Sequence, residues 1–63
     1  MCLSTVYRNV KSQDTVAMRN VMRIECRDNL VILTDLMERT LEIPGKLLEA
    51  DLVNGFVVVE EAQ

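Results

Sequence analysis

The sequence contains no histidine and no tryptophan, and Tyr7 and Phe56 are its only aromatic residues. Without histidine the chain lacks the commonest general base and the commonest protein ligand for transition metals. Two aromatic side chains are too few to form a platform on which several nucleic-acid bases stack. No nucleophile–base pair, phosphate-binding loop or cofactor fingerprint is visible, so we expect a protein that is not an enzyme.

Positive charge and long apolar runs are also scarce. Ten acidic and seven basic residues give a net charge of −3, which argues against a nucleic-acid module that works by electrostatics alone. No run of about 18 apolar residues could span a membrane, and no signal peptide is recognisable. We therefore expect a cytoplasmic protein whose thiols are reduced, with no membrane partner.

The length of 63 residues fits one domain, residues 1–63, and no second one. A chain this short buries only roughly 60% of the surface that its unfolded form exposes. Ordering costs on the order of 1.5 kcal/mol per residue, which nearly cancels the hydrophobic gain. Because only Cys2 and Cys26 are available for a disulfide, self-association is the expected source of further burial, and we predict a homodimer.

Short alternating segments rich in β-branched residues predict an all-β fold with a small antiparallel barrel or rolled sheet. A single helical turn is expected at residues 46–50. About five strands are expected, and they cover residues 2–8, 22–27, 30–34, 39–43 and 56–59.

Tight turns are predicted between these strands. Asp28-Asn29 is a plausible two-residue hairpin turn, because both residue types tolerate positive φ. Residues 35–38 favour a second hairpin, although a helix over 35–43 is also compatible with the pattern. Asn54-Gly55 is the strongest turn signal and predicts a type I′ turn.

Cys2 is the residue with the clearest chemical potential. A thiolate is a soft metal ligand and a strong nucleophile, and at position 2 it lies beside the amine of the chain start. If Met1 is removed, the amine and thiolate of one residue close a five-membered chelate ring. If Met1 is kept, its amine, the Cys2 amide nitrogen and the thiolate form two fused rings. Both sets suit square-planar nickel(II) or copper(II) better than tetrahedral zinc.

One Cys2 supplies too few ligands for a closed site. A two-fold dimer would bring two thiolates and two nitrogens to a metal near its axis, and the metal would link the subunits. The simpler interpretation is that Cys2 is a small residue near a chain end.

The remaining sulfur-containing residues are best interpreted as structural. Cys26 follows Met22 and Ile24 at alternate positions and is expected to be a small buried hydrophobe. Met18 and Met37, like Met22, lie in segments that need core filling, so copper(I) binding by thioethers is the weaker hypothesis.

Arg19, Arg23 and Arg27 recur every four residues. On a strand they would share one outward face, with Val21 and Glu25 between them. A solvated face is the simpler interpretation. The alternative is an RNA-contact face, because small barrels often bind RNA through one surface.

Several short segments occur in a distinctive order. They are Met1-Cys2, Leu3-Ser4-Thr5-Val6-Tyr7, Ile43-Pro44-Gly45, Ala50-Asp51-Leu52, Asn54-Gly55 before a β-branched strand, and Glu60-Glu61. Through these segments the chain resembles CooT-type proteins over nearly its whole length.

The resemblance implies an SH3-like barrel that forms a homodimer and binds nickel(II) through Cys2. It also implies a metallochaperone or nickel sensor that serves maturation of carbon monoxide dehydrogenase, with that enzyme or its maturation factors as partners. Some members of the family are labelled predicted RNA-binding proteins. The alternatives are therefore an RNA-binding barrel and a protein-interaction module that uses an exposed sheet edge.

Overall fold

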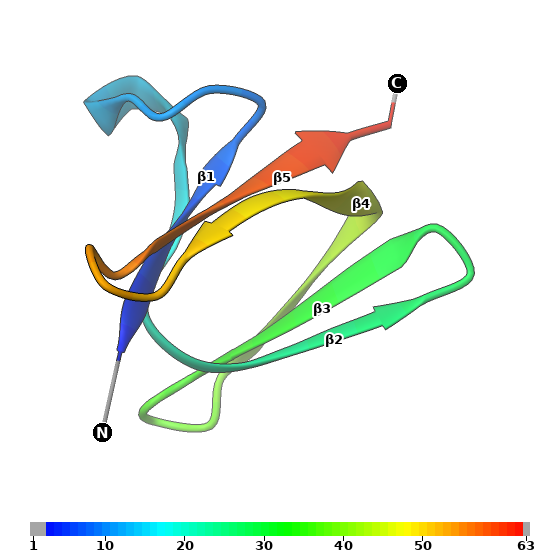
Figure 1. The fold of residues 1–63 in the computed structure, drawn as a ribbon. Coiled ribbons are helices and arrows are strands. Elements are labelled where there is room, and N and C mark those ends of the chain that lie inside the picture. The colour runs from blue at the N-terminus through cyan, green and yellow to red at the C-terminus, as the bar shows by residue number, and fades with distance from the viewer. Residues whose placement is uncertain (1–2, 63) are drawn as a thin grey trace.

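The structure, a computed structural model, describes residues 3–62 and consists of five strands and one short 3₁₀ turn (Figure 1). The all-β prediction is confirmed. Cys2 lies outside the described residues. Within residues 3–62 there is no helix of the length and hydrophobicity needed to cross a bilayer. The elements are β1 (Ser4–Arg8), η1 (Gln13–Thr15), β2 (Val16–Arg27), β3 (Leu30–Asp35), β4 (Thr40–Asp51) and β5 (Phe56–Glu61).

The five strands form one sheet that closes on itself in the order β1-β2-β3-β4-β5. Closure occurs at β1, which pairs with β2 on one side and with β5 on the other. Four pairings are antiparallel, but β1 and β5 are parallel, with Val6 opposite Val57. The expected antiparallel arrangement is confirmed for four pairings, and the parallel β1–β5 pairing that closes the sheet was not expected. The SH3-like assignment and the homodimer stay predictions.

Strands β2 and β4 are long because each pairs with two different strands, one after the other along its length. The first half of β2 pairs with β1 and its second half, from Val21, pairs with β3. Likewise β4 pairs first with β3 and then, from Gly45, with β5. The helical turn expected at residues 46–50 is wrong, because this segment is held in the ladder with β5 and pairing overrides its helix propensity.

The core lies inside the closed sheet and is built mainly from β-branched side chains. Strand β3 illustrates the alternation, since Val31 and Leu33 are fully buried while Leu30 and Ile32 between them are partly exposed. The buried hydrophobic cluster comprises Val6, Val21, Val31, Leu33, Ile43, Val57 and Val59.

Two predicted hairpins are confirmed and one turn type is not. Asp28 and Asn29 both have positive φ (45° and 64°) and connect β2 to β3. The β3–β4 connection over residues 35–38 is a turn and not a helix. Asn54-Gly55 lies in a turn, but only Gly55 has positive φ (75°), so the type I′ assignment, which needs two such residues, is wrong.

Candidate functional site

The start of β1 is firmly held in the sheet. Ser4 is buried and pairs with Val21 of β2. Thr5 pairs with Phe56 of β5, and its backbone N–H donates to the carbonyl oxygen of Gly55 at 3.0 Å. The chain is therefore anchored between two strands only two residues after the predicted metal ligand Cys2 in the sequence.

Beside this anchor, a groove of about 310 Å³ separates the second half of β2 from the second half of β4. Its position follows from the pairing pattern, since these two half-strands bond to different neighbours. Most of its lining is apolar. The lining residues are Ser4, Val21, Met22, Arg23, Ile24, Cys26, Leu47, Ala50, Leu52 and Val57.

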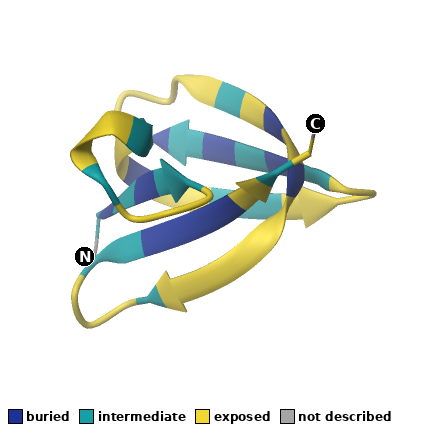
Figure 2. Cartoon of the chain, turned by 90° about the horizontal axis from the view of Figure 1, so that it is seen from above, coloured by how far each residue is buried: buried dark blue, intermediate teal, exposed yellow. Residues whose placement is uncertain are grey.

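Large apolar side chains at the groove are open to solvent. Met22 is 45% exposed, Leu47 42% and Leu52 68%. Figure 2 shows the second half of β4 as an exposed strand beside the buried β5. Clustered exposed apolar residues next to a groove are typical of an interaction surface and not of a solvated face.

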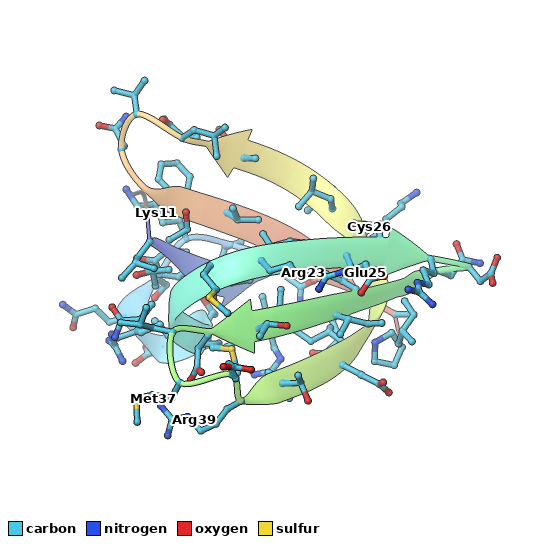
Figure 3. All side chains as sticks on the ribbon, turned by 90° about the horizontal axis from the view of Figure 1, so that it is seen from below. Lys11, Arg23, Glu25, Cys26, Met37 and Arg39 are labelled. Atoms are coloured by element: carbon cyan, nitrogen blue, oxygen red, sulfur yellow. The ribbon has the colours of Figure 1, made fainter. Side chains whose placement is uncertain are left out.

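Cys26 lies in this groove and is exposed, so the interpretation of Cys26 as a small buried hydrophobe is wrong. It pairs with Val31 of β3, which is fully buried. The difference arises because β3 is covered by β4 on its other side, whereas β2 has no neighbouring strand beyond Val21 on the side away from β3, within residues 3–62. Figure 3 shows Cys26 beside this uncovered margin of β2.

The methionines divide between core and surface. Met18 packs against the hydrophobic cluster, as predicted. Met22 and Met37 are 45% and 74% exposed, so the expectation that they fill the core is wrong for both. Met37 lies at the tip of the β3–β4 turn, where Figure 3 shows it pointing away from the sheet.

No group of three or more histidine, cysteine, aspartate or glutamate side chains is placed to hold a metal ion within the part of the chain that the structure describes. Cys26 is the one described cysteine. Cys2 stays the predicted ligand.

Arg23 and Arg27 lie on either side of Glu25, and both form ion pairs with it. The Nη2 of Arg23 is 3.7 Å from one carboxylate oxygen, and the guanidinium of Arg27 donates a hydrogen bond to the other. That hydrogen bond, together with the charges of the two arginines, lowers the pKa of Glu25 despite partial desolvation. The positive charge expected on this face is thus partly neutralised.

Arg19 does not extend this pair into a continuous stripe. Val21, expected on the same outward face, is 3% exposed and belongs to the core. An irregularity in the β2–β3 register between Val21 and Arg23 changes the alternation at this point. Arg19 instead borders a separate groove of mixed polar and apolar lining, together with Asp35 and Arg39. RNA contact through the three arginines stays a prediction.

The two aromatic residues form a cluster that the sequence pattern did not indicate. The rings of Tyr7 and Phe56 are 6.4 Å apart and inclined at 73°, an edge-to-face arrangement. The Nζ of Lys11 lies 4.3 Å from the centre of the Phe56 ring. The Lys11 cation and the edge-to-face contact reduce the ring surface that is open to stacking.

Comparison with known families decides the relationship. The family described as "CO dehydrogenase accessory protein CooT" matches residues 1–60, nearly the whole chain. The chain belongs to the CooT family. A search of curated proteins finds no match to it. The resemblance inferred from the sequence is confirmed, and the CooT match includes Cys2 and both halves of the groove. Membership assigns the chain to an accessory family of CO dehydrogenase.

Proposed function

We propose that this protein is a homodimeric nickel carrier, in which Cys2 of each subunit binds one shared nickel(II) ion as cargo for maturation of carbon monoxide dehydrogenase. The match to the CooT family supports the accessory role. Nickel, the thiolate ligands and the dimer are the specific content of the proposal.

The donor inventory supports a shared site. The sequence has no histidine, and the described residues contain no cluster of metal-binding side chains. The Cys2 thiolate with one adjacent nitrogen gives two donors per chain. Two chains related by a two-fold axis give two sulfur and two nitrogen donors, a set that square-planar nickel(II) accepts.

The observation that most favours this arrangement is the anchored start of β1 beside an exposed apolar groove. Ser4 both pairs with Val21 and lines the groove. Apolar surface at this location is where a second subunit would gain burial energy. Association there would bring the chain starts of two subunits toward one region, as a shared ion requires.

Nickel titration under reducing conditions tests the proposal. The parent protein should show thiolate-to-nickel charge-transfer absorption that saturates near half an equivalent of nickel per chain. Cys2→Ser should abolish the band, and Cys26→Ser, which removes the other thiol, is the matched control and should retain it. Undiminished nickel affinity in Cys2→Ser would overturn the assignment.

The carrier and sensor versions of this function differ in what happens to the ion. A carrier should lose nickel to nickel-free carbon monoxide dehydrogenase faster than to buffer containing a chelator of equal affinity. Equal rates of loss would favour the sensor. Cys26→Ser again serves as the control, because Cys26 has no part in the proposed site.

A further inference from the structure

The second half of β2 has an unpaired edge. From Met22 onward β2 pairs with β3 alone, because its pairing with β1 ends at Val21. No strand within residues 3–62 occupies the other side of this segment. Such an edge presents unpaired N–H and C=O groups and can accept another strand.

The hydrogen-bond pattern identifies which groups are free. The backbone N–H of Asp35 donates to the carbonyl oxygen of Arg39. The backbone N–H and C=O groups of odd-numbered β3 residues therefore point to β4, and those of even-numbered β3 residues point to β2. The β2 partners of even-numbered β3 residues are Glu25, opposite Ile32, and Arg27, opposite Leu30. Residues at the intervening β2 positions, Ile24 and Cys26, therefore direct their backbone groups to the open edge.

We propose that a second copy of this chain pairs with the open edge of β2, antiparallel, about a two-fold axis that passes through Ile24. In this register the free backbone groups of Ile24 bond to those of Ile24 of the partner subunit. The inference rests on the dimer of the proposed function, but it concerns only where the subunits meet and not which atoms bind nickel.

Charge complementarity selects this register from its neighbours. An axis at Ile24 places Arg23 opposite Glu25 of the partner subunit, twice by symmetry. An axis at Glu25 would oppose two glutamates and also set Arg23 against Arg27 of the partner subunit. An axis at Arg23 would oppose two arginines. Directly opposed like charges destabilise strand pairs and opposite charges stabilise them. An axis at Cys26 would also set Glu25 against Arg27 of the partner subunit, but it would place Ile24 opposite Asp28 of the partner subunit, beyond the end of β2. The Ile24 register therefore combines favourable charge pairs with the longer run of paired strand residues.

The apolar groove completes the surface. It lies on the side of Ile24 and Cys26, and Leu47 and Leu52 form its far wall. A strand added at the β2 edge would cover Met22, which is 45% exposed. An interface with charged pairs on one face of the added strands and apolar contacts on the other fits a copy of β2 itself, which has both kinds of residue in alternation.

Cysteine cross-linking tests the register. In a Cys2→Ser background, Met22→Cys should form an intersubunit disulfide with Cys26 of the partner subunit when oxidised glutathione is supplied. The two positions face each other in the Ile24 register, at about 5.5 Å between Cα atoms, within disulfide range. Within one chain they are four residues apart on a strand, about 13 Å, and cannot pair.

Two control variants make the result specific. Cys2→Ser alone retains Cys26, which the register separates from its symmetry mate by about 13 Å, and it should stay uncross-linked. Cys2→Ser with Met37→Cys adds a thiol on the β3–β4 turn at a more exposed position than Met22 and should also stay uncross-linked. Equal cross-linking in all three proteins, or none with Met22→Cys, would overturn the register. Because Cys2 is absent throughout, neither outcome bears on nickel binding.

Charge reversal provides a second measurement by sedimentation equilibrium without metal. Glu25→Arg should weaken the dimer about tenfold, because two favourable pairs become repulsive. Arg23→Glu with Glu25→Arg should restore it. Glu42→Arg, which changes the net charge equally on an exposed position of β4, should have no such effect. A dimer indifferent to Glu25→Arg, or a monomeric parent protein, would contradict the proposal.

Discussion

Asp35 and Arg39 close the β3–β4 turn through both oxygens of one carboxylate. Oδ1 of Asp35 accepts the backbone N–H groups of Met37 and Arg39, each at 2.9 Å. Oδ2 accepts the Nε–H of Arg39 at 2.8 Å. The Asp35 side chain is only 4% exposed, whereas that of Arg39 is 75% exposed. The buried carboxylate thus accepts hydrogen bonds from backbone and side-chain donors of the turn. These bonds explain why a charged residue is buried at the end of a core strand.

Asp35→Asn should destabilise the turn. An asparagine in this position turns one acceptor oxygen into an NH₂ group, which would oppose a donor of Arg39 or of the backbone. Thermal unfolding followed by circular dichroism should show a lower Tm, by on the order of 5 °C for a domain of this size. Asp28→Asn, at an exposed turn position with positive φ that asparagine tolerates, is the control and should leave Tm unchanged.

The same carboxylate should make stability depend on pH. Burial raises the pKa of Asp35, but the hydrogen bonds from Arg39 and Met37 and the charge of Arg39 outweigh it, so its pKa lies below the usual value of 3.8. A lowered folded-state pKa gives stability that is fully present above the unfolded pKa and lost as pH falls through the folded one. The Tm difference between the parent protein and Asp35→Asn should therefore shrink below pH ~4. A difference that stays constant to low pH would contradict this role.

Gly45→Ala should strongly destabilise the fold. A Cβ at position 45 would lie 1.8 Å from the carbonyl oxygen of Glu60, a backbone atom that cannot move aside. We expect a loss of about 3 kcal/mol in the free energy of unfolding, measured with urea. Gly55→Ala is a useful comparison, because its Cβ would meet only the Leu3 carbonyl at 3.6 Å. That variant should lose about 1 kcal/mol, from positive φ alone.

Glu38→Gly should stabilise the protein. Glu38 has a φ of 65°, and its side chain is exposed at the β3–β4 turn. Glycine has no Cβ and adopts this left-handed conformation without steric strain. The substitution is therefore expected to raise the free energy of unfolding by about 1 kcal/mol. Glu38→Ala removes the same carboxylate without that relief and should not be more stable than the parent protein. Equal gains in both variants would indicate a charge effect and not backbone strain.

Local patterns in the sequence located part of each strand and most turns, but they missed the first half of β2 and the second half of β4. Asp28-Asn29 and the 35–38 hairpin were predictable because turn chemistry depends on a few neighbouring residues. The continuation of β4 through Pro44-Gly45 was not, because it depends on a long-range ladder with β5. The parallel β1–β5 pairing, which closes the sheet, is likewise a contact between the two ends of the chain.

The predicted site residues differ in how far they depend on the fold. Cys2 was inferred from its position in the sequence alone and stays a predicted ligand. Cys26 was misjudged, because alternation with Met22 and Ile24 indicates a face but not whether another strand covers it. The arginine stripe failed at Val21 for a related reason, since a register irregularity cannot be seen in a residue spacing. The groove forms because β2 and β4 each change pairing partner along their length. No pattern in the sequence indicated it.

Native mass spectrometry of the reduced protein with added nickel counts subunits and metal ions in the same particle. We expect a species of two chains with one nickel ion, which disappears in Cys2→Ser and persists in Cys26→Ser. A single chain that retains nickel, or a two-chain nickel species that survives Cys2→Ser, would contradict it.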